Sequence, residues 1–278
     1  MSYLCPLCGL PLTLAERAWG CPRQHKFDIA KEGYVNLLPV QKKNSKDPGD
    51  NKQMMFARRE FLTAGYYQGL SDRVNQLALE YAGRAQQVLD IGCGEGYYSH
   101  RLYHTLAQDH PCHFQGLDIS KSAIKYAAKR YPELQFCVAS AYEMPIASHS
   151  IDLAIRIYAP SKNEELQRVM GSDGILITVS PGPMHHFALK QQIYAEPRLH
   201  PTSDACLAGF ECLHQERLMS QLELKDSEHI AHFLEMTPYA WKFTAEQKQR
   251  FAVEGLCCEL DFQIEVHRIS RQQSDLSY

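Results

Sequence analysis

The chain has 278 residues, of which 45% are hydrophobic and 22% are charged, and its formal net charge is −3. This composition excludes a disordered or fibrous protein and one coated in basic surface, and the length allows one large core beside a small module. No apolar run is long enough to cross a bilayer, and the first residues lack the continuous apolar stretch of a signal peptide. We therefore expect a cytoplasmic protein with no membrane partner.

The first predicted element is a metal site. Two residues separate Cys5 from Cys8, three separate Cys21 from His25, and the twelve residues between the pairs suffice for a short hairpin. In a chain without an export signal, this spacing favours metal over disulfides. Because the four ligands leave no position for water, we predict a structural Zn²⁺. A module over residues 1–38 has too little core to fold alone, so zinc should supply its folding free energy.

Residues 39–83 are predicted to be a linker followed by helices. QKKNSKDPGDNKQ is polar and is broken by Pro48 and Gly49, which is typical of an exposed loop. The stretch from Met54 to Ala82 has apolar residues at helical spacing, interrupted near Gly65. Between Arg23 and Arg59, nine Lys and Arg stand against four Asp and Glu, a net of +5. Such a run is usually a solvated face and is by itself a weak sign of an anionic partner.

Residues 84–278 are predicted to form an α/β domain that binds a nucleotide-type cofactor. Val88 to Ile91 suit a buried parallel strand, and Gly92, Gly94 and Gly96 allow a tight turn before a helix. This G-x-G-x-G run departs from the dinucleotide pattern G-x-G-x-x-G. The next strand ends at Asp118, whose carboxylate can accept hydrogen bonds from both hydroxyls of a ribose.

The later segments continue the alternation of strands and helices. LQFCVAS, IDLAIRIYAP and GILITVSPG read as strands and EELQRVM as a helix, so the fold class is a doubly wound, Rossmann-like parallel sheet with right-handed crossovers. We expect helices and loops from about residue 186 to residue 240, as a candidate lid. CCELDFQIEVHRI alternates apolar and polar residues and predicts an antiparallel strand at the end of the sheet.

VLDIGCGEG, followed by Asp118 and by the RIYAP and GSDGILITVSPGP runs, resembles the class I S-adenosylmethionine-dependent methyltransferases. With the Cys3His motif and the segments FDIAKEGYVNLLP, DPGD and MTPYAW, nearly the whole chain resembles the large-subunit (23S) ribosomal RNA guanine-N1-methyltransferase A family. The resemblance implies that S-adenosylmethionine is the cofactor and that N1 of one guanine is methylated. It also implies that the zinc module grips a 23S ribosomal RNA hairpin, free or in an assembling large subunit, and that the chain can form a homodimer.

The glycine loop, the strand ends and the resemblance together define the expected cofactor site. Ser140 stands where many relatives of the fold carry an acid or an amide against adenine. The predicted cofactor-binding residues are Tyr67, Asp90, Gly92, Gly94, Glu95, Gly96, Asp118, Ser140 and His185. Of these, Tyr67 and His185 are included because the resemblance implies that they contact the cofactor.

The expected chemistry needs a proton to leave N1 of guanine. Arg156 and Tyr158 end a strand at the edge where active residues of doubly wound sheets gather. We predict that Arg156 donates to O6 and that Tyr158 stacks on the base; an ion pair and simple packing are the alternatives. His185 or His186 is a candidate proton acceptor because imidazole titrates near neutral pH.

Two rival functions fit parts of the sequence. A small-molecule methyltransferase would carry the zinc module without binding RNA. A ribosome-assembly factor would bind RNA without catalysis, but the complete set of Asp90, the three loop glycines and Asp118 argues against it. A nicotinamide dehydrogenase is disfavoured because the G-x-G-x-x-G glycine is absent.

Overall fold

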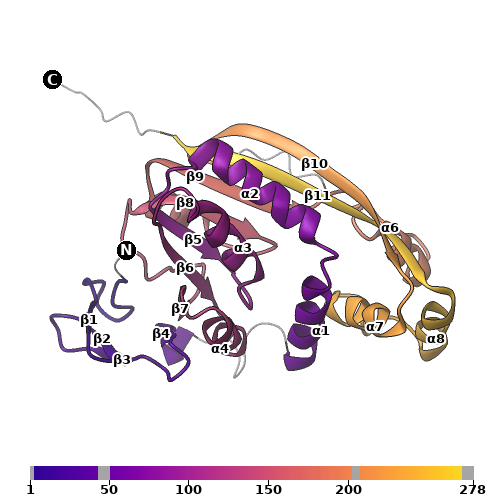
Figure 1. Ribbon diagram of the computed structural model, residues 1–278, viewed down its shortest axis with the longest axis horizontal. Coiled ribbons are helices and arrows are strands. Elements are labelled where there is room, and N and C mark those ends of the chain that lie inside the picture. Colours follow the sequence, from indigo (N-terminus) through magenta and orange to yellow (C-terminus); the bar gives the residue numbers. More distant parts are fainter. Residues whose placement is uncertain (1–2, 43–50, 202–206, 271–278) are drawn as a thin grey trace.

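A small sheet and a large sheet organise the chain in the computed structural model (Figure 1), which describes residues 3–42, 51–201 and 207–270. The predicted loop around Pro48 and Gly49 lies outside the described residues. The small sheet consists of β1 (Thr13–Ala15), β2 (Ala18–Gly20) and β3 (Lys26–Asp28), paired antiparallel in that order. Its first hairpin joins the two pairs of predicted metal ligands, as the spacing indicated.

The large sheet has eight strands in the order β10-β11-β9-β8-β5-β6-β7-β4. The parallel strands are β4 (Val35–Asn36), β5 (Gln87–Ile91), β6 (His113–Asp118), β7 (Gln135–Val138), β8 (Ile151–Ile157) and β9 (Met170–Pro181). β11 (Leu256–Ile269) and β10 (Phe210–Leu224) complete it antiparallel. The strand order reverses at β5, between β6 and β8, which is where doubly wound sheets bind ligands. The predicted fold class is confirmed.

Helices and the small sheet cover the two faces of the large sheet. On one face, Val88 and Ile155 join a core with residues of α2 (Gln68–Ala82), α3 (Tyr97–Leu106) and α4 (Lys121–Arg130). On the other face, their neighbours Leu89 and Ala154 join a core with α5 (Asn163–Val169) and the zinc module. Alternate strand residues thus face opposite layers, as expected for a sheet buried on both sides.

The N-terminal module is packed on the large sheet. Tyr3, Cys5 and Cys21 belong to the same core cluster as Leu89 of β5. The amide of Leu4 donates to the carbonyl of Pro145 at 2.9 Å. β4, which lies within the range predicted as the zinc module, pairs in parallel with β7 as the edge strand of the large sheet.

The segment from residue 186 to residue 240 differs from the prediction of helices and loops. It contains α6 (Phe187–Ile193) and α7 (Ser227–Met236), but between them lies the 15-residue strand β10. β10 is an edge strand with most side chains exposed, so its sequence lacks the alternation that marks a half-buried strand. The antiparallel β11 was predicted correctly.

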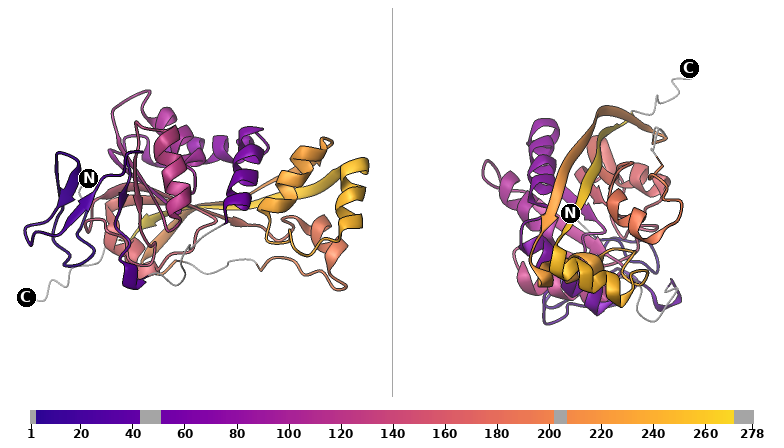
Figure 2. Two further views of the ribbon diagram at one scale, coloured as in Figure 1. Left: turned by 90° about the horizontal axis from the view of Figure 1, so that it is seen from below. Right: turned by 90° about the vertical axis from the view of Figure 1, so that its right-hand side faces the viewer.

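Two helices lie at the end of the β10–β11 pair where Leu224 is opposite Leu256, and one of them contacts the first helix of the chain. Figure 2 shows the orange and yellow strands leading to α7 and α8 (Ala245–Glu254). α1 (Lys52–Thr63), which with α2 confirms the predicted helices around Gly65, packs against α7, and the rings of Phe61 and Phe233 stack at 5.2 Å. A short 3-10 helix spans Val40–Lys42. In the described part of the chain, every helix is too short or too polar to span a membrane.

Candidate active site and metal centre

The four predicted metal ligands lie together. The ligand atoms of Cys5, Cys8, Cys21 and His25 are all within 4.8 Å of one another. Cys8 Sγ lies 3.7 Å from Cys21 Sγ, and His25 Nδ1 lies 3.4 Å from Cys5 Sγ and from Cys21 Sγ. A tetrahedral Zn²⁺ with ordinary bond lengths would separate two sulfurs by about 3.8 Å and a sulfur from a nitrogen by about 3.6 Å. The arrangement therefore fits one zinc ion held through Nδ1 of the histidine.

Two tight turns set the ligand geometry. In the first, the amides of Cys8 and Gly9 point to the carbonyl of Cys5 at 3.3 and 2.8 Å, and Gly9 has a positive φ of 72°. In the second, the amide of Gln24 donates to the carbonyl of Cys21 at 2.9 Å. Each turn brings both ligands of its pair to one side, and the hairpin between the turns brings the pairs together.

The glycine loop lies between β5 and α3. Gly92 has a φ of 76°, and a Cβ there would lie 2.4 Å from Cβ of Ala159, so only glycine fits. Gly94 also has a positive φ and borders the cavity described below. Gly96 is the N-cap of α3 with a φ of 81°, and a Cβ there would approach the Tyr131 ring. Gly96 is not among the cavity-lining residues, so its role is in the turn.

Asp118 is held at the end of β6 by two backbone amides. The amide of Gly94 donates to its Oδ2 at 3.0 Å and that of Ser120 to its Oδ1 at 2.7 Å. These bonds fix the carboxylate beside the glycine loop. The structure thus places Asp118 beside the glycine loop, and its role in binding a ribose stays a prediction.

Asp90 is a buried carboxyl at the end of β5. It is 2% exposed, and Ser99 Oγ donates to its Oδ2 at 2.5 Å. Burial raises the pKa of Asp90 to about 7, and nearby Asp118 adds to this, although the hydrogen bond from Ser99 opposes it. Asp90 is therefore a carboxyl group of the glycine-loop region with a pKa near neutral pH.

Glu95 brings a second buried carboxyl to the glycine loop. Both oxygens are buried without a hydrogen-bond partner in the described part of the chain. Burial raises the pKa of Glu95, while the positive charges of Arg59, Arg130 and Arg58 lower it. Arg59 Nη1 is the nearest, at 3.9 Å from Oε2. A donor from a bound ligand would satisfy these oxygens.

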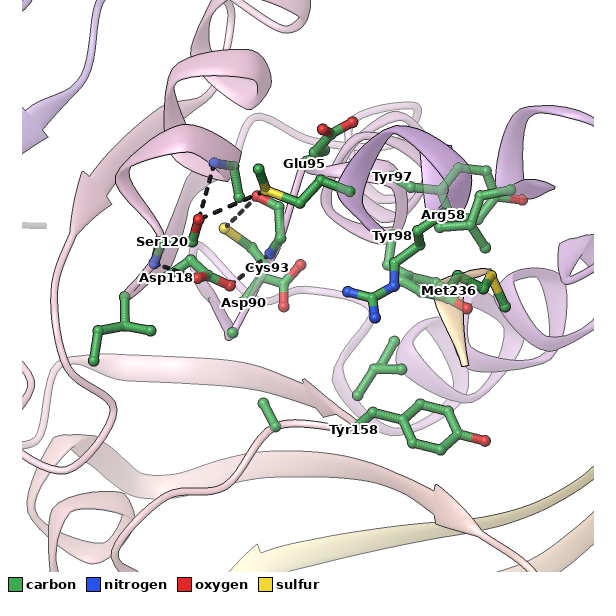
Figure 3. Close-up of a pocket in the computed structure, with 18 of the residues that line it drawn as sticks. Arg58, Asp90, Cys93, Glu95, Tyr97, Tyr98, Asp118, Ser120, Tyr158 and Met236 are labelled. Carbon is green, nitrogen blue, oxygen red and sulfur yellow. Dashed lines mark hydrogen bonds between the residues drawn. The ribbon is translucent and has the colours of Figure 1, made fainter. Parts of the chain in front are cut away.

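A cavity of about 530 Å³ runs from the glycine loop to Tyr158, a size typical of ligand sites. Figure 3 shows Asp90 and Asp118 at one end and Tyr158 and Met236 at the other. Eight predicted cofactor residues line it: Tyr67, Asp90, Gly92, Gly94, Glu95, Asp118, Ser140 and His185. Ser140 follows β7, and its Oγ accepts from the amide of Tyr142 at 3.1 Å.

Aromatic side chains and histidines form the other end of the cavity. Tyr67 is 6% exposed, and its hydroxyl lies 3.1 Å from Nε2 of His186. The rings of His185 and His186 stack at 3.8 Å. Tyr158, at φ 54° directly after β8, is 43% exposed and places its hydroxyl 3.3 Å from Nε2 of His185. Tyr158 thus presents its ring at the cavity wall, where the base was predicted to stack.

Arg156 does not line this cavity. Its Nη1 donates to Ser161 Oγ at 2.9 Å. Burial lowers the pKa of Arg156, and the nearby charge of Glu265 offsets part of this shift. Alternation along β8 sends the side chains of Arg156 and Ile157 to opposite faces, and it is Ile157 that borders the cavity. The structure therefore shows no contact through which Arg156 would reach a base there.

The sequence did not predict three contributions to the cavity. Arg58 and Arg59 come from α1, and His200 follows α6. Met236 ends α7, and the residues up to Tyr239 follow it. MTPYAW stood out in the sequence only through the family resemblance. Nothing in the spacing of these residues indicated that they would meet the glycine loop.

Both parts of the chain match known families. Residues 3–46 match the zinc-ribbon family described as "RlmA, N-terminal", and residues 83–237 match the family described as "Methyltransferase domain". The first match contains all four predicted zinc ligands, and the second contains the glycine loop and most of the cavity.

Three curated relatives match most of their own length. The 23S rRNA (guanine(748)-N(1))-methyltransferase of Streptomyces fradiae is 30% identical over 265 residues, which is 91% of each chain. The name "Putative 23S rRNA (guanine-N(1)-)-methyltransferase" belongs to two further relatives. That of Micromonospora griseorubida is 31% identical over 85% of this chain and 86% of the relative, and that of Bacillus subtilis is 29% identical over 86% of each.

Proposed function

The chain belongs to the RlmA family of 23S rRNA guanine-N1-methyltransferases, and on this premise we propose that it methylates N1 of one guanine in a hairpin of 23S ribosomal RNA. It is an S-adenosylmethionine-dependent methyltransferase with a Cys3His zinc site. The observation that carries the proposal is that similarity to guanine-N1-methyltransferases extends through both the zinc module and the cavity domain, over 91% of the chain. A shared methyltransferase fold alone would not include the module.

The cavity fits S-adenosylmethionine at its glycine-loop end. Asp118 can accept the ribose hydroxyls, and Gly94, where a Cβ would meet nothing within 4 Å, leaves space for a ligand beside the backbone. The buried, unpartnered oxygens of Glu95 suit the ammonium group that the cofactor's methionine part carries. When bound, S-adenosylmethionine supplies a methyl group on a positively charged sulfur, an activated leaving group, so the protein must mainly align the acceptor.

The target base would enter at the Tyr158 end. Tyr158 can stack on a purine, and the backbone carbonyls before Pro160 can accept hydrogen bonds from its nitrogens. A guanine paired in a helix could not reach this wall, so the base must be unpaired or turned out of its stack. A hairpin loop offers such a base without the cost of opening a helix.

A basic face with exposed aromatic rings borders the cavity and can carry the RNA backbone. α4 has four exposed cationic side chains and no acid, and α1 adds Arg58 and Arg59 at the cavity wall. The Arg59 guanidinium lies 5.0 Å from the ring centre of Phe56 and 5.3 Å from that of Tyr126, and both rings are 47% exposed. Figure 1 shows α4 between β4, next to the zinc module, and α1. Cations here would meet phosphates, while the rings offer surfaces on which bases can stack. The cations of α4 are Lys121, Lys125, Lys129 and Arg130.

The proposal is tested with 23S ribosomal RNA from a strain that lacks this protein. The purified protein is incubated with the RNA, or with large subunits, and with methyl-labelled S-adenosylmethionine, and the nucleosides are separated by mass. We expect label in 1-methylguanosine, at a single position by primer extension. Label in another nucleoside, or none in RNA or subunits from a protein that binds cofactor and zinc, would overturn the proposal.

Two further expectations belong to this proposal. A ribosomal RNA substrate agrees with the expected cytoplasmic location. A homodimer would widen the RNA-binding cleft, and light scattering of the purified protein would give its mass as one or two chains of 31.7 kDa.

A further inference from the structure

A second group of potential metal ligands lies outside both the zinc module and the cavity. In the described part of the chain, two groups of His, Cys, Asp or Glu bring their ligand atoms within 4.8 Å of one another. One is the Cys3His site. The other consists of His100, His104 and Glu133, and none of these three residues lines the cavity. Neither the methyl transfer nor the RNA contacts proposed above use this group, so it needs an explanation of its own.

The two histidines share one face of α3. They are four residues apart, a spacing that places two side chains one above the other on a helix. The centres of the His100 and His104 rings are 4.3 Å apart. α3 begins directly after the glycine loop, with Gly96 as its N-cap. The helix therefore holds two imidazoles close together at a short distance from the loop.

Glu133 is held in a tight turn between α4 and β7. The amide of Leu134 donates to the carbonyl of Tyr131 at 3.1 Å, which closes a four-residue turn. Pro132 takes the second position of this turn, where its fixed φ is favoured. The backbone of Glu133 is thus fixed before its side chain makes any contact.

The carboxylate of Glu133 faces both histidines. Its Oε1 lies 3.5 Å from Nε2 of His100 and 3.8 Å from Nε2 of His104. Both separations exceed the usual length of an N–H···O hydrogen bond. A tetrahedral Zn²⁺ with ordinary bond lengths would separate a nitrogen ligand from an oxygen ligand by about 3.4 Å. The separation at His100 is close to this value, and the side chain of His104, which is 59% exposed, can rotate to close the small difference.

The His100 ring is oriented by packing. It stacks on the buried ring of Tyr131, with the centres 4.2 Å and the planes 22° apart. Burial and then the neighbouring His104 lower the pKa of His100, although Glu133 opposes this shift. An imidazole must be neutral to bind a metal, so the lowered pKa favours a metal ligand. An ion can still reach the group from solvent, because the side chains of all three residues are partly exposed.

We propose that His100, His104 and Glu133 form a second zinc site, in which Nε2 of each histidine and a carboxylate oxygen bind the ion. Imidazole and carboxylate are both ordinary ligands of Zn²⁺, and three protein ligands leave the fourth position open to water. The ligands of the Cys3His site lie within one small module. The second site instead joins α3, which follows the glycine loop, to the turn that follows the cationic helix α4.

The test is zinc binding by the full-length protein, dialysed so that only the four-ligand site keeps its ion. The protein is titrated with micromolar Zn²⁺ by calorimetry, and its metal content is then analysed. We expect one further zinc per chain in wild type. His104→Gln and Glu133→Gln each remove one ligand at a partly exposed position and should leave the fold intact. Both should bind the second zinc at least about 10- to 100-fold more weakly, which is the cost of losing even an outer partner of a metal ligand.

Stability provides a second readout. A ligand present at about 100 times its Kd lowers the unfolding equilibrium constant about 100-fold. Zinc at this level should do so for wild type and not for His104→Gln or Glu133→Gln, as measured by urea unfolding at fixed free zinc. Because all of these proteins keep the Cys3His site, the difference between wild type and each variant reports the second site alone.

His113→Gln is the matched control. It changes an exposed histidine at the start of β6, outside the ligand group, and should bind the second zinc as wild type does. No further zinc in wild type, saturation only at millimolar zinc, or a second zinc that both ligand variants keep would overturn the proposal. The measurements use neither RNA nor S-adenosylmethionine, so their outcome is independent of the proposed function.

Discussion

The zinc site and the cavity differ in how far apart along the chain their residues lie. The four zinc ligands fall between Cys5 and His25, within two turns and one hairpin. The cavity takes residues from Met55 to Tyr239, brought together by α1, the carboxyl ends of the parallel strands and the segments after α6 and α7.

Because of this difference, we expect a single substitution to affect the two sites differently. The zinc site depends on a few local bonds and on the ion, so the loss of one ligand should abolish it. The cavity has many contributors, and most single changes should weaken one property of it. None of the zinc ligands lines the cavity, although the module packs on the large sheet whose strand ends form part of the cavity wall.

The largest effect is expected from Cys21→Ser, which removes a zinc ligand. Formation of a structural zinc site contributes on the order of 10 kcal/mol, so the module should lose both its ion and its fold. RNA methylation should then fall below detection while cofactor binding, measured by calorimetry, persists.

Cys257→Ser is the control, since Cys257 is exposed on β11 and lies outside the zinc cluster. It should keep one zinc per chain. Full RNA methylation by zinc-free Cys21→Ser would contradict the role of the module.

The next effect concerns Asp90 and pH. The pKa of Asp90 is about 7 in the folded protein, against about 3.9 in an unfolded chain, so the folded state binds the extra proton between these values. Stability from this group is present at low pH and is lost as pH rises through about 7. Asp90→Asn cannot ionise. The difference in the free energy of unfolding between this variant and wild type should therefore shift in favour of the variant as pH rises from about 4 to about 7, by roughly 1 to 4 kcal/mol.

Urea unfolding of the cofactor-free proteins at several pH values measures this gain. Asp109→Asn, at an exposed site after α3, should run parallel to wild type at every pH. A difference between Asp90→Asn and wild type that does not vary with pH would show that Asp90 is ionised throughout.

A smaller effect is expected from Gly92→Ala. The added Cβ would lie 2.4 Å from Cβ of Ala159 in a backbone that L side chains rarely adopt. Overpacking of this kind costs about 1–3 kcal/mol, and the shifted loop should weaken cofactor binding. Gly69→Ala in α2, where a Cβ meets nothing within 4 Å, should be neutral or slightly stabilising. Equal melting temperatures and cofactor affinities for the two variants would contradict the loop geometry.

The smallest effect is expected from Trp241→Ala. Trp241 is 78% exposed just after the cavity-lining residues Met236 to Tyr239, with Lys242 Nζ 4.8 Å from its ring centre. If a neighbouring base stacks on it, RNA affinity should fall by about 1–3 kcal/mol with cofactor affinity unchanged. Filter binding measures the loss. Val253→Ala, at a similarly exposed residue of α8, should have no effect, and equal RNA affinity in both variants would remove Trp241 from the interface.

The predictable part of the molecule is the part specified locally. The zinc ligands were predicted from their spacing. The glycine loop was predicted because it directly follows a buried strand, and Asp118 because it ends the next strand. The parallel sheet followed from the alternation of strands and helices. The final antiparallel strand followed from its alternating apolar and polar residues. In each case, neighbours in the sequence are also neighbours in space.

The parts that were missed depend on distant contacts. β10 is an edge strand held in the sheet by its pairing with β11. Because most of its side chains are exposed, its sequence does not alternate between apolar and polar residues. His200 lines the cavity because the fold holds it beside Pro183 and His185, which are distant in the sequence. No local pattern distinguishes it among the 13 histidines of the chain. Arg156 was placed at the correct strand end, but the alternation of β8 sends its side chain away from the cavity.

The central claim is that RNA, held by the zinc module and the basic face, delivers one guanine to the cavity. The most direct measurement compares methyl transfer to 23S ribosomal RNA and to guanosine monophosphate at equal guanine concentration. The account predicts 1-methylguanosine in RNA and no detectable methylation of the mononucleotide, because a free base lacks the contacts that hold the hairpin. Comparable rates on both substrates would contradict it and would indicate a small-molecule enzyme in which zinc and the basic face do not select the substrate.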